Sequence, residues 1–130
     1  MATNREQETD NYVIKEKSQF GDVRIANDVI AIIAGLAATE VKGVAKMSGN
    51  ITKDLISKLG MRNLSRGVTV VVTPNSVTVD VAIELLYGYN VIEVSKKVQD
   101  KVKSAIETMT GLTVEEVNVR IAGVAALDEE

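Results

Sequence analysis

The chain has 130 residues and a mass of 14.0 kDa, a size that fits one domain. It contains no Cys and no His, which excludes disulfides, thiolate nucleophiles, and the commonest general base and metal ligand. Aromatic residues make up only 3% of the chain and the net charge is −3, so stacking on bases and overall attraction to nucleic acid are not expected. We therefore expect a soluble, non-catalytic protein that uses no cofactor or metal and binds no nucleic acid.

The first twenty residues are mostly polar and charged, and they lack the apolar segment of a secretory signal. Such a composition buries too little apolar surface to offset the entropy of ordering, so a flexible tail is expected over residues 1–20. A folded domain is expected over residues 21–125, followed by an acidic end at 126–130. The longest apolar run, Val29–Ala38, is about half of the ~20 residues that cross a bilayer. The sequence thus predicts a cytoplasmic location without transmembrane insertion.

In the first half of the chain, a short strand is expected over residues 22–25, where polar and apolar residues alternate. Asn27 or Asp28 is expected to cap a helix that continues to about Val41 and ends at Gly43. A second short strand at 44–47 and a short helix at 51–59, ended by Gly60, follow. Alternation over 68–73 and 77–86, with Pro74-Asn75-Ser76 between, predicts a β-hairpin with one apolar face.

In the second half, Asn90 and Glu93 form a capping box, which predicts the start of a long helix that ends at Gly111. Its apolar positions step by three and four and are expected to form one buried stripe: Val91, Val94, Val98, Val102, Ala105 and Met109. Alternation over 117–121 predicts a closing strand. The order β-α-β-(α)-β-β-α-β indicates a two-layer α+β sandwich, with a mixed or antiparallel sheet and the two main helices on one face. A ferredoxin-like strand order is compatible with this but not required.

An ordered set of short phrases resembles a known bacterial family. The phrases are residues 21–25 (GDVRI), 37–44 (AATEVKGV) with Met47, 67–68 (GV), 79–80 (VD), 87–88 (YG), 98–99 (VQ), 106–119 (IETMTGLTVEEVNV) and 123–124 (GV). In this order and spacing they resemble the alkaline shock protein family, the envelope stress response proteins of Gram-positive bacteria, over roughly residues 21–124.

The resemblance implies a small non-enzymatic protein of cell-envelope homeostasis, with no catalytic residues to carry over. Some members associate with the membrane through a small membrane-anchored partner and self-assemble, which implies a scaffold or adaptor at the cytoplasmic face. Other members are encoded near fatty-acid metabolism, which implies the alternative of a soluble regulator that docks on an enzyme of lipid synthesis.

The first helix is the strongest candidate for self-association, because residues 29–38 are apolar on every side and such a helix is normally covered on more than one side. The candidate residues are Ile30, Ile33, Leu36 and Ala37. The alternative is that residues 51–66 or the tail of the same chain cover this helix.

Two other surfaces are weaker candidates. Cations predominate between Lys42 and Arg66, and Lys53, Lys58, Arg62 and Arg66 could meet anionic lipid or an acidic partner, although a solvated surface is the simpler interpretation. The turn Tyr87-Gly88-Tyr89 could bind a partner at the start of the long helix. Its simpler interpretation is structural, with Gly88 permitting the turn and both tyrosines packing over the sheet edge.

Overall fold

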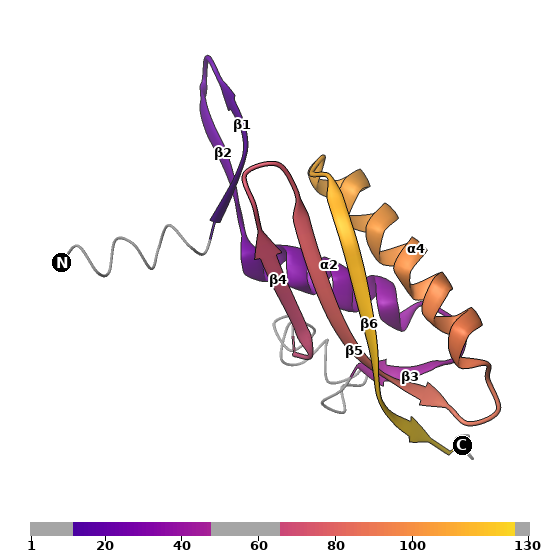
Figure 1. The fold of residues 1–130 in the computed structure, drawn as a ribbon. Coiled ribbons are helices and arrows are strands. Elements are labelled where there is room, and N and C mark those ends of the chain that lie inside the picture. The colour runs from indigo at the N-terminus through magenta and orange to yellow at the C-terminus, as the bar shows by residue number, and fades with distance from the viewer. Residues whose placement is uncertain (1–11, 48–65, 127–130) are drawn as a thin grey trace.

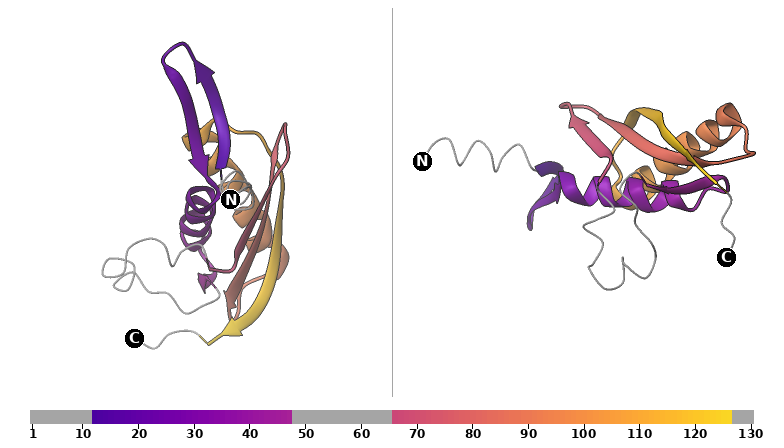
Figure 2. Two further views of the ribbon diagram at one scale, coloured as in Figure 1. Left: turned by 90° about the vertical axis from the view of Figure 1, so that its left-hand side faces the viewer. Right: turned by 90° about the horizontal axis from the view of Figure 1, so that it is seen from below.

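The computed structural model describes residues 12–47 and 66–126. In chain order the elements are β1 (Tyr12–Ser18), β2 (Gly21–Ala26), α2 (Asn27–Thr39), β3 (Val44–Met47), β4 (Val68–Val72), β5 (Val77–Leu86), α4 (Val91–Thr110) and β6 (Val114–Ala125). Both helices cover the same face of a four-stranded mixed sheet, while β1 and β2 form a separate hairpin (Figures 1 and 2). The predicted α+β sandwich is confirmed. The predicted helix at 51–59 lies outside the described residues.

β5 is the central strand of the sheet. β4 pairs antiparallel with its first half and β3 with its second half. The Ala82 and Leu86 amides donate to Gly67 and Gly43, which places β3 and β4 in series along one edge of β5. β6 runs parallel along the whole other edge, because α4 carries the chain back to the start of β5 before β6 begins.

The core lies between the sheet and the helices. Every second residue of β5 faces it and is at most 3% exposed: Val77, Val79, Val81, Ile83 and Leu85. From α2, Ile30, Ala34 and Ala38 are fully buried against this face. The predicted alternation of the β4–β5 hairpin therefore does place one apolar face in the core.

The buried stripe of α4 differs from the predicted one. It consists of Val94, Val98, Val102, Ile106 and Thr110, whereas Val91 is 43% and Met109 70% exposed. Each step of four residues turns about 40° past a full helical turn, so this stripe drifts around the helix as α4 follows the twisted sheet. By the last turn the buried side has moved to Ile106 and Thr110, and Met109 faces outward. The helix ends are as predicted, with the Asn90 side chain accepting from the Glu93 amide and Gly111 in the left-handed conformation.

Two predictions for the N-terminal part are wrong. Residues 12–18 are a strand rather than part of a tail, because pairing with β2 satisfies their backbone and Val13 joins the core. The N-cap of α2 is Ala26, with no side-chain cap, and Asn27 and Asp28 already lie inside the helix. The Asp28 carboxylate in the first turn instead favours the helix start through the macrodipole. The helix ends at Thr39, two residues earlier than expected.

Candidate functional site

An apolar groove runs between the outer sides of α2 and α4. Its volume is about 640 Å³, and it is lined by Val29, Ile32, Ile33, Leu36, Ala37, Glu40, Lys101, Ser104, Ala105, Thr108 and Met109. Val29 and Met109 are 45% and 70% exposed, so its walls are open to solvent. An ion pair joins Glu40 to Lys101 at 3.4 Å, and both side chains are more than half exposed. We call this surface the α2–α4 groove.

The apolar character of α2 on every side now has a physical explanation. One side of the helix packs on the sheet and the other side forms the groove. Of the four predicted self-association residues, Ile30 cannot take part, because its side chain is fully buried in the core; the prediction is wrong for this residue. Ile33 and Ala37 are buried at the floor of the groove, and Leu36 lies half-buried in its wall. The sequence analysis missed Val29, Ile32, Ala105 and Met109 as groove residues.

The structure does not assemble the other two candidate surfaces. Arg66 is exposed, and Lys53, Lys58 and Arg62 lie outside the described residues. In the turn after β5, Tyr87 is 70% exposed and Gly88 adopts a φ of 100°, with open space around it. Tyr89 packs on the core and lies against Gly43. Tyr89 therefore has the structural role, and Tyr87 alone is presented to solvent.

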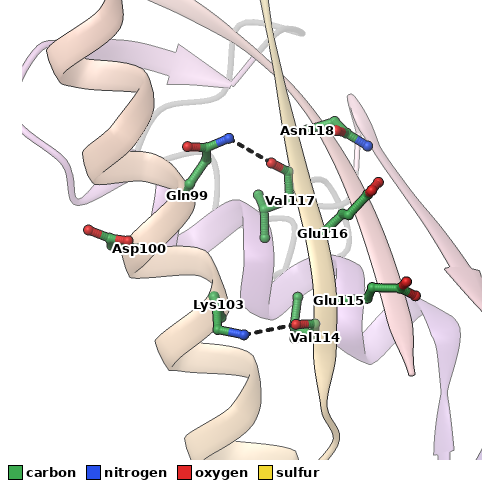
Figure 3. A pocket seen from close by; sticks show the side chains of 8 residues that line it. All are labelled: Gln99, Asp100, Lys103, Val114, Glu115, Glu116, Val117 and Asn118. Carbon is green, nitrogen blue, oxygen red and sulfur yellow. Dashed lines mark hydrogen bonds between the residues drawn. The ribbon is translucent and has the colours of Figure 1, made fainter. Parts of the chain in front are cut away.

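A polar depression of about 350 Å³ lies where α4 meets the outer edge of β6 (Figure 3). Two α4 side chains donate to backbone carbonyls of that edge: Gln99 Nε2 to Val117 O at 3.0 Å, and Lys103 Nζ to Val114 O at 2.9 Å. These bonds occupy backbone acceptors that would otherwise be open on an edge strand. Within residues 12–47 and 66–126, no cluster of three or more acidic side chains could hold a metal ion.

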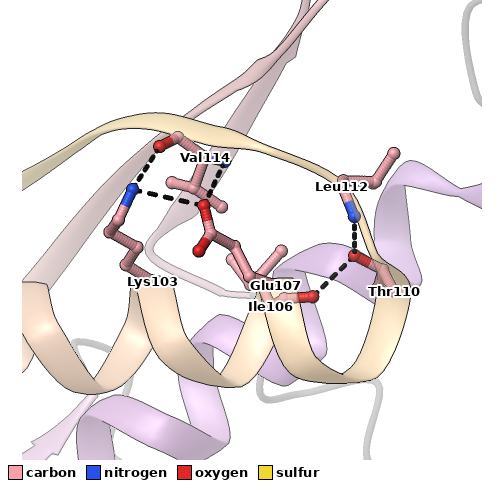
Figure 4. Close-up of polar contacts among 6 residues, drawn as sticks. All are labelled: Lys103, Ile106, Glu107, Thr110, Leu112 and Val114. Carbon is pink, nitrogen blue, oxygen red and sulfur yellow. Dashed lines mark hydrogen bonds and ion pairs between the residues drawn. The ribbon is translucent and has the colours of Figure 1, made fainter.

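A second set of bonds fastens the end of α4 to the start of β6 (Figure 4). Glu107 Oε2 accepts from the Val114 amide at 2.9 Å and from Lys103 Nζ at 3.2 Å. One turn later, Thr110 Oγ1 donates to Ile106 O at 2.6 Å and accepts from the Leu112 amide at 3.1 Å. The Val114 amide, and then Lys103, hold the pKa of Glu107 below its ordinary value.

This lowered pKa makes the stability of the protein dependent on pH. A carboxylate whose pKa is lower in the folded chain stabilises the fold above its unfolded pKa, and the benefit is lost as the pH falls through the folded pKa. We expect Glu107→Gln to lower the melting temperature at neutral pH, and the difference from the parent chain to shrink in acid. Thermal unfolding followed by circular dichroism over a pH series measures this. A difference that stays constant across the series would contradict the assignment.

The fold and its surfaces define a small α+β protein in which two helices leave an apolar groove on the side away from the sheet. The chain belongs to the alkaline shock protein 23 family, which has a cell envelope-related function; the family pattern matches residues 15–126. The resemblance read from the short phrases is thereby confirmed.

Relatives of similar length occur in Gram-positive bacteria. The uncharacterized protein YqhY of Bacillus subtilis is 36% identical over 118 residues, covering 88% of this chain and 87% of that protein. Spy1614 of Streptococcus pyogenes is 35% identical over 118 residues, covering 89% and 98%. Solved structures with a related shape include variants of MamM CTD, with 14% identity and a TM-score of 0.47 over 78% of this chain and 96% of that one. Neither helix described here is long and apolar enough to span a membrane.

Proposed function

We propose that this member of the alkaline shock protein family is a non-catalytic scaffold or adaptor of the cell envelope. In this proposal the protein self-associates and is held at the cytoplasmic face of the membrane by a protein partner. The observation that carries the proposal is the α2–α4 groove, because large apolar side chains gather there beside an exposed ion pair. Contiguous exposed apolar surface of this kind is characteristic of sites that bind other proteins.

The affinity of the groove for a protein partner would come from burying its apolar side chains. Fully burying an exposed Val, Leu, Ile or Met side chain contributes about 1.5–3 kcal/mol, and a half-buried one contributes part of this. Four groove residues of these types are exposed or half-buried: Val29, Ile32, Leu36 and Met109. A partner that fills the groove gains several such contributions and loses no buried charge, since the Glu40–Lys101 pair stays at the solvent-exposed end.

The polar groups support a binding role rather than a catalytic one. Asp80 accepts a hydrogen bond from Asn118 at 2.8 Å, and Glu115 accepts one from Ser76 at 2.8 Å. Glu107 joins α4 to β6. These carboxylates are engaged in contacts that connect neighbouring elements, and they do not converge on the groove.

The mass of the full chain in solution tests self-association. We expect the parent chain to exceed 14.0 kDa increasingly with concentration, and the double variant Val29→Lys/Met109→Lys to remain monomeric with an unchanged melting temperature. Both side chains are exposed, so the added charges oppose docking without entering the core. A parent chain that is strictly monomeric at high micromolar concentration would sink the proposal.

Fractionation of cells that carry the two forms extends the test to location. The proposal expects the parent chain with the membranes and the charged variant depleted there. Recovery of the parent chain away from membranes, together with an enzyme of lipid synthesis, would instead support the alternative of a soluble regulator.

A further inference from the structure

The β1–β2 hairpin projects from the body of the protein as an arm (Figures 1 and 2). Its strands pair only with each other, and Val13 and Ile25 fasten its base to the core. At its tip, Ser18 Oγ donates to Gly21 O and accepts from the Phe20 amide, both at 3.1 Å. A two-stranded hairpin has marginal stability by itself, so an arm of this kind gains from a surface that packs against it.

The tip of the arm carries the most exposed large apolar side chain in the described part of the chain. Phe20 is 90% exposed, and Val23, Ile14 and Tyr12 on the same hairpin are each about half exposed. The arm leaves the body at the first residue of α2, and the side chain of Lys15 lies against Gly111 at the end of α4. The tip of the arm extends beyond both helices (Figures 1 and 2), and none of the described arm residues lines the groove of its own chain. An aromatic ring held at the end of an arm in this way is suited to anchor an interface.

We propose that the β1–β2 arm of one copy inserts Phe20 into the α2–α4 groove of a second copy. This inference rests on the proposed self-association and specifies its geometry. The groove is apolar and about 640 Å³ in volume, which leaves ample room for a phenyl ring and its apolar neighbours. The occupant is the complementary feature of the same chain: a protruding ring with apolar neighbours.

The charges of the two surfaces are also complementary. On the arm, Asp22 and Arg24 lie 3.7 Å apart, and at the end of the groove Glu40 and Lys101 lie 3.4 Å apart. The side chains of Arg24, Glu40 and Lys101 are more than half exposed and that of Asp22 is 31% exposed, so water screens both pairs and each contributes little where it is. On docking they can exchange partners, Asp22 with Lys101 and Arg24 with Glu40 of the other copy, so that no charge is left unpaired.

The spacing along each surface permits this exchange. Phe20 lies in the turn before β2 and Asp22 is the second residue of β2, so the two Cα atoms are at most roughly 7 Å apart. Lys101 precedes Ala105 of the groove by four residues, roughly 6 Å along a helix. With the ring seated beside Ala105, the Asp22 carboxylate therefore comes level with the Lys101 ammonium. Because each copy has one arm and one groove, the contact is head-to-tail and can repeat from copy to copy.

Sedimentation of the full chain with single substitutions tests the contact. We expect Phe20→Ser to weaken self-association by about tenfold or more, from the loss of one buried aromatic ring. The matched control is Tyr87→Ser, which removes another exposed aromatic residue outside both surfaces and is expected to leave association unchanged. The opposite outcome is that Phe20→Ser associates as the parent does while Val29→Lys/Met109→Lys is monomeric. The groove would then pair with a surface other than the arm, which would contradict this inference but not the proposed function.

Mixing the arm variant with the groove variant tests the contact between arm and groove more directly. Phe20→Ser retains a groove, and Val29→Lys/Met109→Lys retains an arm, so an equimolar mixture is expected to form pairs of one copy each and nothing larger. A mixture that stays monomeric, when each variant alone has lost association, would refute the contact between arm and groove.

Cross-linking checks the proximity directly, because the chain has no Cys of its own. Gln19→Cys places a thiol beside Phe20 at the tip, and Met109→Cys places one in the groove wall. We expect a disulfide between these two variants when they are mixed, and none between Gln19→Cys and the control Tyr87→Cys. Equal yields in the two mixtures would contradict the proposal.

Discussion

Replacing Ile30 by Ala is expected to lower the free energy of unfolding by about 2–5 kcal/mol. Ile30 is fully buried between α2 and the sheet, in a core cluster whose described members are all apolar. Its truncation removes apolar contacts and leaves a cavity that the surrounding β-branched side chains of β5 fill only in part. Urea denaturation followed by circular dichroism measures this loss of stability, with one common slope of free energy against urea concentration fitted to both proteins.

Ile32, two residues further along α2, provides the matched control. Ile32 has the same side chain on the same helix but lies half-buried in the groove, so Ile32→Ala is expected to cost clearly less in the monomer. Equal losses at the two positions would mean that α2 is covered on both sides within one chain, and that the groove is not an open surface.

Gly43→Ala is expected to be comparably severe, lowering the free energy of unfolding by about 2–5 kcal/mol in total. Gly43 is buried and adopts a φ of 104°, which side chains rarely tolerate. A Cβ at this position would also lie 2.7 Å from Val94 Cγ2 and 2.8 Å from Tyr89 Cδ2. The start of α4 would have to move away from the segment that joins α2 to β3.

Gly88→Ala separates these two effects. Gly88 has nearly the same φ, 100°, but nothing lies within 4 Å of an added Cβ. The variant Gly88→Ala is therefore expected to lower the free energy of unfolding only by the backbone strain, about 1–3 kcal/mol. Thermal and urea unfolding of both variants gives the contribution of the clash as the difference between them. If Gly88→Ala were as harmful as Gly43→Ala, close packing around Gly43 would not be the cause.

The elements that local chemistry determines could be predicted from the sequence. The β4–β5 hairpin follows from alternation and a Pro-Asn-Ser turn, and α4 from Asn90 at one end and Gly111 at the other. Strand β1 was missed because its two lysines and one glutamate match a solvated tail in composition. This segment is ordered because it pairs with β2 and because Val13 is buried, and neither feature can be read from the number of charged residues.

The groove could be predicted only in part. The apolar run of α2 indicated that the helix is covered on more than one side, but no polar residue marks where one side ends, so Ile30 and Ile32 could not be distinguished. Met109 fits the helical period of the stripe on α4. It faces outward because the sheet twists beneath the helix, and that twist is a property of the assembled strands rather than of the helix sequence.

β5 hydrogen-bonds to each of the other three strands in its sheet, and no other pairing within that sheet is present among the described residues. Detaching β5 would leave β3, β4 and β6 without any neighbour. No smaller sheet can therefore persist as a partly unfolded intermediate, which favours all-or-none unfolding of this layer. The arm pairs with no strand of this layer, so its tip, beyond Val13 and Ile25, can open locally while the rest stays native.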